Sequence, residues 1–270
     1  MSPIIKKLRH PKEGLYGGII RVFGCLFWIF ILLFAIAEAL SSPHGGARIL
    51  MILLYFVLGL VFTLFGEALF RARAIGNMVE VTPAQFPRIH GEITDVARAL
   101  GLAVAPRTFI YNSHGVTNAF AMRLFRTRYV FLTSGIVEAD DDAQLRFIIA
   151  HEIAHHVLGH LNTIQRFLAA PGIFVPFLYP AYSRAREFSC DAVGASVIPD
   201  PEKALTALQM LACGARRLNA QMNSTAFYAQ EDHVPGIAGF VLEIFSSHPR
   251  LTRRVQRLRR CFPARRAPVS

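Results

Sequence analysis

The chain has few cysteines, and none of them is closely paired with another. Its 270 residues include four, Cys25, Cys190, Cys213 and Cys261, with no CxxC spacing. A disulfide framework and a zinc site built from cysteine pairs both need closely spaced cysteines, so neither is indicated. The scattered thiols are consistent with a reducing compartment.

Charged residues are also scarce. Charged side chains make up 17% of the chain and hydrophobic ones 53%, and the mean hydropathy is +0.38. A soluble globular protein normally carries less apolar sequence, so part of this content is expected to face lipid. No internal repeat or low-complexity tract is present. The expected organisation is therefore one sizeable domain with a membrane appendage.

Two long apolar runs near the N-terminus are candidate membrane spans. Residues Val22–Ala37 are uninterrupted apolar sequence that extends to Leu40, and Ile49–Gly66 forms a second run. Each approaches the ~20 apolar residues that a helix needs to cross a hydrocarbon core. The alternative for the first run is a cleaved signal peptide. That alternative is disfavoured because the run lies far from the start, lacks a clear cleavage site and is followed at once by the second run.

The loop between the runs, Ser41–Arg48, is short and rich in turn residues, so the two spans are predicted to form a hairpin. Arg71 and Arg73 follow the second span, whereas the loop contains only Arg48. The positive-inside rule therefore places the N-terminus and everything after Phe70 in the cytoplasm. The basic residues before the first span agree with this orientation: Lys6, Lys7, Arg9 and Lys12.

The net charge of +11 is concentrated towards the C-terminus, in Arg250–Arg266. Basic residues near the cytoplasmic leaflet are attracted to anionic lipid, which fits a membrane protein. Nucleic-acid binding is the alternative, but the stretch lacks interleaved aromatic residues. We therefore expect the lipid bilayer, and no nucleic acid, as a partner.

After the hairpin, the sequence predicts a mainly α-helical domain with a small β-sheet, an α+β fold. Apolar residues recur at helical spacing over Thr82–Leu100. Two short runs of β-branched and aromatic residues indicate strands, and the segment that links them is a candidate to pair with the second. Acidic residues at 140–142 cap a helix from about 143 to 161, and Asp200-Pro201 opens another that extends to about Leu218. The strand segments are Arg107–Tyr111 and Tyr129–Thr133, with Asn118–Arg126 between them. The expected division is 1–75 for the basic N-terminus and hairpin, 76–265 for the domain and 266–270 for a tail.

The helix from about 143 contains the motif His151-Glu152-Ile153-Ala154-His155. Residues four apart lie on the same helical face, so both imidazoles can bind one metal ion. Glu152 lies beside that face, where it can take a proton from a water activated by zinc and later deliver it to a leaving amine. A chance occurrence is the alternative. It is disfavoured because the motif is embedded in apolar residues, among which buried polar groups need a partner.

A catalytic zinc ion normally has three protein ligands, so a downstream carboxylate is needed. Glu187 is the candidate, and Asp191, one helical turn later, can bond the second nitrogen of a ligating histidine. A surface acid that pairs with Arg184 or Arg186 is an equally good interpretation of Glu187 from spacing alone. The sequence by itself leaves the two open.

Beyond these residues, the chain resembles the HtpX-like membrane zinc metallopeptidases, relatives of the CAAX prenyl endopeptidases, along nearly all of its length after the hairpin. The resemblance implies a gluzincin-type metalloprotease domain with Zn²⁺ held by His151, His155 and Glu187. It also implies that Asn118 and His248 line the cleft and bind the substrate and the developing oxyanion, with Arg254 supporting His248. The plainer alternatives are a turn residue for Asn118 and a helix-start residue for His248. The matching segments are Asn118–Ala121, Thr133–Ile136, the HEIAH helix, Glu187–Asp191 and Ser247–Pro249 followed by Arg254.

Two departures from that pattern stand out. Cys190 occupies a position that is usually alanine, where its thiol is either an inert core group or redox-sensitive. Family members generally have further apolar segments after the motif, whereas Phe167–Tyr182 is short and contains three prolines. A single crossing there would also separate His155 from Glu187. We predict either a loop or re-entrant segment at the membrane surface or an internal core loop.

The resulting prediction is a membrane-anchored zinc endopeptidase with Glu152 as the general base, in the inner membrane of a bacterium, acting on misfolded or damaged membrane proteins. The polypeptide substrate is expected to pair as a strand with a sheet edge, either Asn118–Arg123 or Tyr129–Thr133. The alternatives are a non-catalytic zinc-binding scaffold or chaperone, a site-2-type intramembrane protease and a prenyl-protein protease. The other histidines near the motif, His156 and His160, are expected to be structural, and His114 has no assigned role.

Overall fold

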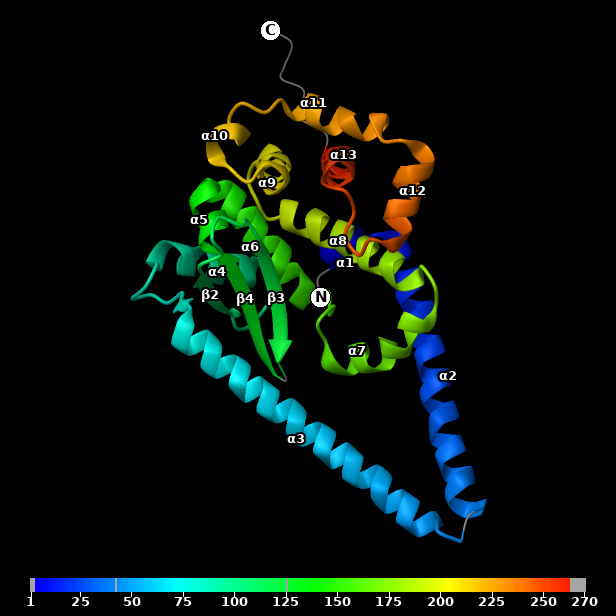
Figure 1. The fold of residues 1–270 in the computed structure, drawn as a ribbon. Helices are drawn as coiled ribbons and strands as arrows, with labels where there is room; N and C mark the ends of the chain where they lie inside the picture. The colour runs from blue at the N-terminus through cyan, green and yellow to red at the C-terminus, as the bar shows by residue number, and fades with distance from the viewer. Residues whose placement is uncertain (1–2, 42, 125, 263–270) are drawn as a thin grey trace.

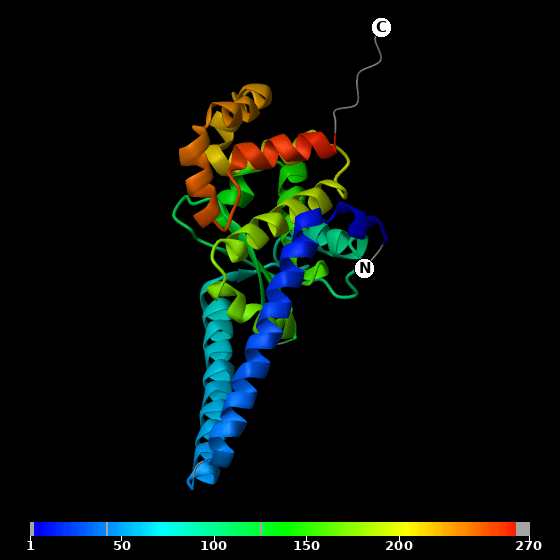
Figure 2. The same ribbon diagram turned by 90° about the vertical axis from the view of Figure 1, so that its right-hand side faces the viewer.

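The computed structural model describes residues 3–41, 43–124 and 126–262. It is mainly helical with one small sheet, as predicted (Figure 1). A short helix, α1 (Pro3–Leu8), is followed by two long apolar helices, α2 (Pro11–Ser41) and α3 (Gly45–Asn77). The remaining elements gather at the end of the hairpin opposite its loop (Figures 1 and 2).

Helices α2 and α3 form the predicted hairpin. Both are long and apolar enough to cross a membrane, and almost none of the residues in their most apolar windows is buried. Apolar surface of this extent is normally covered by lipid or by a partner. The helices approach closely at the loop, where a Cβ atom on Gly45 would lie 1.6 Å from the carbonyl oxygen of Ala39. Only glycine is compatible with this contact.

The sheet has four strands in the order β1-β2-β4-β3. The two predicted strands, β2 and β4, pair in parallel, and the linking segment β3 pairs antiparallel with β4. β4 is therefore an inner strand, so the expectation that Tyr129–Thr133 offers a free edge is wrong. The free edge beside β4 belongs to β3. The bounds are β1 (Val79–Glu80), β2 (Arg107–Tyr111), β3 (Ala119–Leu124) and β4 (Thr127–Thr133).

The motif helix, α6 (Asp142–Val157), lies in the core. It begins at Asp141, whose carboxylate accepts a hydrogen bond from Gln144 N (2.9 Å) while the Gln144 side chain bonds back to the Asp141 backbone, a reciprocal capping box. It ends before Gly159, which adopts φ = 78°. The predicted end at 161 was therefore a turn too late. α6 packs between the sheet and a later helix, α8 (Leu178–Ala195). Helix α4 (Pro87–Ala99), predicted from Thr82, covers another side of α6, and α5 (Ser134–Ala139) precedes it.

The proline-containing segment forms no helix with the length and composition of a membrane span. It forms α7 (Thr163–Ala169), a 3-10 turn η1 (Ala170–Phe174) and the start of α8 (Leu178–Ala195). Its large side chains are largely exposed, including Phe167 (56%) and Phe174 (70%), so an internal core loop is excluded. The segment packs along α2: Trp28 stacks on Phe167 with ring centroids 4.5 Å apart. It therefore extends the exposed apolar surface of the first membrane helix.

The C-terminal part is a set of helices that cover α8. α9 ends at Cys213 because Gly214 adopts φ = 70°, so the predicted end at Leu218 is wrong. The last helix, α13, buries Arg254 on the face that packs against α8 and α9. The basic stretch Arg250–Arg266 and the tail 266–270 lie partly or wholly outside the described residues. The bounds are α9 (Glu202–Cys213), α10 (Arg216–Asn219), α11 (Ser224–Ala229), η2 (Gln230–His233), α12 (Gly236–Phe245) and α13 (Leu251–Cys261).

Candidate metal centre

Helices α6 and α8 bring the predicted metal-binding residues together. Glu187 on α8 lies opposite both motif histidines: its Oε2 atom is 3.6 Å from His151 Nε2, and its Oε1 atom is 3.5 Å from His155 Nε2. All three ligand atoms lie within 4.8 Å of one another. The surface-acid interpretation of Glu187 is excluded because this residue is only 5% exposed. Arg184 instead forms an ion pair with Glu243.

The three side chains fit a zinc ion. Two atoms that each bind a tetrahedral zinc ion at about 2.0–2.1 Å are separated by about 3.3 Å, which is close to the observed nitrogen–oxygen distances. Two imidazoles and one carboxylate are also a donor set that zinc accepts in catalytic sites. His151 and Glu187 are buried, so water competes little with an ion for these atoms.

Glu152 lies beside this group and faces the same cavity, whose volume is about 290 Å³. The side chain is 7% exposed. Burial, opposed by the charge of His151, raises the pKa of the Glu152 carboxyl to about 7. Ala121 on β3 borders the same cavity. A carboxyl with this pKa can both accept and release a proton near neutral pH.

Asp191 and Arg254 form a buried pair behind His151. Asp191 Oδ1 lies 3.0 Å from His151 Nδ1, as the one-turn spacing from Glu187 predicted. Arg254 donates to both oxygens of Asp191, from Nε at 2.8 Å and from Nη2 at 2.6 Å. Arg254 was expected to support His248, but it instead forms two hydrogen bonds with Asp191. This contact fixes the carboxylate that orients His151.

His248 and Asn118 both line this cavity. His248 Nδ1 lies 3.3 Å from Glu187 Oε2, and this hydrogen bond raises the pKa of His248. Asn118 is exposed just before β3, with its Oδ1 atom accepting from Ala119 N (2.9 Å). Its amide nitrogen is thus the group that it can offer to a ligand. Both residues are close enough to the metal-binding group to contact a substrate.

Comparison with known families agrees with this geometry. The family model described as "Peptidase family M48" matches residues 83–175 and 164–261, which together cover the chain from α4 to α13. The chain belongs to peptidase family M48. Because it also carries two long apolar helices, it is a membrane metalloprotease of this family.

Curated relatives match most of the chain. "Protease HtpX homolog" from Methylibium petroleiphilum is 26% identical, and the alignment covers 86% of this chain and 94% of the relative. The proteins of the same name from Burkholderia lata and Ralstonia pickettii are each 27% identical, covering 83% and 86% of this chain and 91% and 95% of those relatives. Among solved structures, Ste24p from S. mikatae aligns with 89% of this chain and 65% of its own, at 16% identity and a TM-score of 0.48.

Two hydrogen-bonded contacts beside the metal-binding group were not predicted from the sequence, where His160 was expected only to be structural. His160 lies 3.1 Å from His155, measured between their Nδ1 atoms, and its Nε2 atom is 3.0 Å from Glu13 on α2. Nothing in the spacing of the sequence relates Glu13 to the motif, because 147 residues separate it from His160. His156, in contrast, is structural as expected, since its Nε2 atom bonds the carbonyl oxygen of Tyr129. His114 lies on an exposed loop with φ = 52°.

Proposed function

We propose that the chain is a zinc endopeptidase with Glu152 as its general base. The observation that carries the proposal is the convergence of His151, His155 and Glu187 next to Glu152 in one cavity bordered by a free strand edge. A zinc ion at this position would act as a Lewis acid that lowers the pKa of a water molecule and polarises a substrate carbonyl.

The side chains then have distinct roles. The Glu152 carboxylate accepts the proton of the attacking water and delivers it to the leaving amine nitrogen, because it borders the same cavity as the three ligands. His248 and Asn118 lie where an imidazole N–H and an amide N–H can donate to the developing oxyanion. Asp191, held by Arg254, keeps His151 in the tautomer that presents Nε2 to the metal.

We infer that the substrate binds as an extended strand along β3. β3 is an edge strand, and Asn118 to Ala121 border the cavity. Ala121 and Glu152 border the same cavity, so a peptide paired with this edge passes the catalytic carboxylate. Main-chain pairing tolerates many sequences, which suits the broad specificity needed to degrade misfolded or damaged membrane proteins.

The orientation that we propose places the domain on the cytoplasmic side of a bacterial inner membrane, with the bilayer around α2 and α3 and the exposed segment α7–η1 at its surface. Arg71 and Arg73 at the inner end of α3 support it. The exposed thiol of Cys261 can show on which side of the membrane the domain lies. A membrane-impermeant maleimide should label it in inverted vesicles and leave it unlabelled in spheroplasts, with Cys261→Ser as the control. Labelling in spheroplasts would mean the opposite orientation.

Metal removal tests the proposed activity. The purified full-length protein in detergent is expected to cleave casein, to lose this activity after chelation and dialysis, and to regain it on addition of one equivalent of zinc. The product fragments, followed by mass spectrometry, should arise from internal cleavage. Casein cleavage that persists in the zinc-free protein would contradict the proposal.

A further inference from the structure

The N-terminal turn of the membrane helix α2 is docked against the catalytic helices. Glu13 on this turn is only 1% exposed, although it precedes the apolar span. Its carboxylate accepts hydrogen bonds from Arg9 and from the hydroxyl of Ser189 on α8. The neighbouring His10 donates from its backbone to Ser189 Oγ (2.9 Å), and its ring stacks on Phe188 at 5.5 Å.

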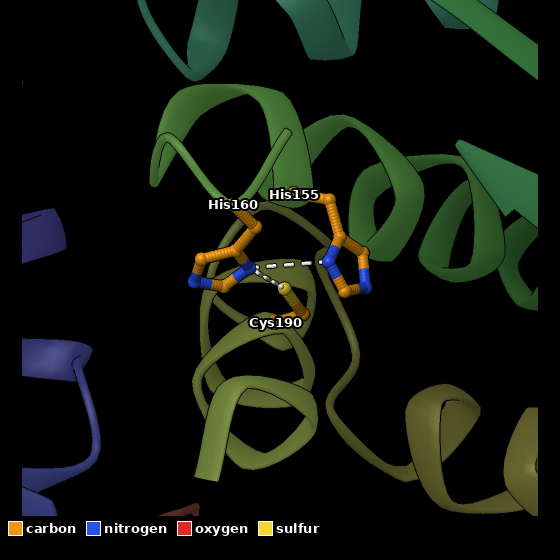
Figure 3. A group of neighbouring side chains, drawn as sticks. All are labelled: His155, His160 and Cys190. Atoms are coloured by element: carbon orange, nitrogen blue, oxygen red, sulfur yellow. Dashed lines mark hydrogen bonds between the residues drawn. The ribbon is translucent and has the colours of Figure 1, made fainter. Parts of the chain in front are cut away.

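The same carboxylate begins a chain of hydrogen bonds that ends at a proposed zinc ligand. Glu13 Oε1 lies 3.0 Å from His160 Nε2. On the other side of the same ring, His160 Nδ1 lies 3.1 Å from His155 Nδ1 (Figure 3). His155 Nε2 is the atom that faces Glu187. His160 is 5% exposed and Glu13 1% exposed, so water has little access to the chain.

Donors and acceptors along this chain can be arranged in one way that leaves Nε2 of His155 free. A carboxylate only accepts, so Glu13 holds the proton of His160 on Nε2. His160 Nδ1 is then an acceptor, and His155 must supply the proton from its own Nδ1. The lone pair of His155 therefore resides on Nε2, where a metal ion needs it.

We propose that Glu13 and His160 are positioning residues for the zinc ligand His155, so that the membrane helix itself sets the tautomer of the metal centre. The inference rests on the proposed zinc site. It assigns to His155 a partner that corresponds to the Asp191 partner of His151 but comes from a segment far away in the sequence. Docking of α2 onto the domain and binding of zinc are thereby coupled: undocking the first turn removes the acceptor that orients His155.

A second metal ion is the rival use of the same atoms. His155, His160 and Cys190 offer ligand atoms within 4.8 Å of one another, with Cys190 Sγ 3.6 Å from His160 Nδ1 (Figure 3). Such an ion would require His155 to bind metal through both nitrogens. The hydrogen-bonded chain uses only one nitrogen of His155 for the metal, and the geometry favours it.

The test measures zinc affinity by competition with a chromophoric chelator, on the full-length protein in detergent. Glu13→Gln replaces a carboxylate, which can only accept, with an amide that can accept or donate, so the proton of His160 is no longer held on Nε2. His160→Leu removes the bridge. Each variant is expected to bind zinc 10- to 100-fold more weakly, the range observed when a partner of a ligating histidine is lost. His160→Gln, which keeps one acceptor and one donor, should restore most of the affinity. Glu38→Gln, an exposed acid on the same helix that pairs with Arg48, should leave it unchanged.

Circular dichroism identifies variants that fail to fold. For variants that do fold, the visible spectrum of the cobalt-substituted protein reports the geometry of the metal centre. The absorption of bound Co²⁺ should change in Glu13→Gln and stay as in the wild type in Glu38→Gln. Wild-type zinc affinity and an unchanged cobalt spectrum in both Glu13→Gln and His160→Leu would overturn the proposal. Two zinc ions per wild-type chain, one of them lost in Cys190→Ala, would overturn it in favour of the second site. A wild-type protein that binds no zinc would instead refute the proposed function.

Discussion

Glu152→Gln is expected to lower kcat for casein cleavage by about 10²–10⁴-fold, the usual contribution of a general acid–base residue, while zinc content stays at that of the wild type. Glutamine has nearly the same shape and volume as glutamate, so the packing around position 152 is kept. It cannot take up and return a proton at neutral pH. Activity should therefore fall without loss of the metal centre, which zinc analysis and the rate of casein cleavage measure together.

The matched control for this change is Glu138→Gln on the exposed surface of α5, which removes a carboxylate that does not line the cavity. Its activity should equal that of the wild type. Equal activity of Glu152→Gln and the wild type would refute the assignment of the general base. Loss of zinc from Glu152→Gln would show instead that this carboxylate helps to bind the metal.

Glu187→Ala is expected to weaken zinc binding by more than about 100-fold, beyond the range for residues that only orient a ligand, and to abolish activity. The substitution removes one of three ligand atoms. It also leaves His248 and Arg254 without the carboxylate that lies 3.3 Å and 3.6 Å from them, respectively. Loss of these contacts and of the packing of a buried side chain is costly, so the melting temperature should fall as well. Chelator competition and thermal unfolding in detergent measure the two effects.

Glu243→Gln is the control for Glu187→Ala, because it removes a partly buried carboxylate that takes no part in the metal-binding group. Glu243 lies on α12 and pairs with Arg184 and Arg253, but it does not border the metal-binding group. The variant should retain wild-type zinc affinity even if its stability is reduced. If Glu187→Ala bound zinc as tightly as Glu243→Gln, another residue would have to be the third ligand.

The features that could be predicted from the sequence are those encoded by local spacing. The apolar runs around Val22–Ala37 and Ile49–Gly66 specify membrane helices whatever the rest of the chain does. The four-residue spacing of His151 and His155 places both imidazoles on one helical face. The one-turn spacing from Glu187 predicted that Asp191 would reach a ligating histidine, and its distance from His151 agrees. For Glu187 itself, spacing left a surface acid equally possible, and only the family resemblance implied a metal ligand.

The features that could not be predicted depend on which segments pack together. The free edge of the sheet belongs to β3 because β2 pairs in parallel with β4, and strand order has no local signal. Arg254 was expected at His248, yet packing of α13 on α8 directs it to Asp191. The role of Glu13 appears only because α2 continues beyond the membrane span and docks on α8.

The most direct test of the zinc site is X-ray absorption at the zinc edge, on the full-length protein loaded with one equivalent of zinc. We predict a first shell of nitrogen and oxygen atoms only, at about 2.0–2.2 Å, with the outer scattering of two imidazole rings. This is the pattern of His151, His155 and Glu187. A sulfur atom at about 2.3 Å would contradict it, because the ion would then lie on Cys190 and not between the two motif histidines and Glu187.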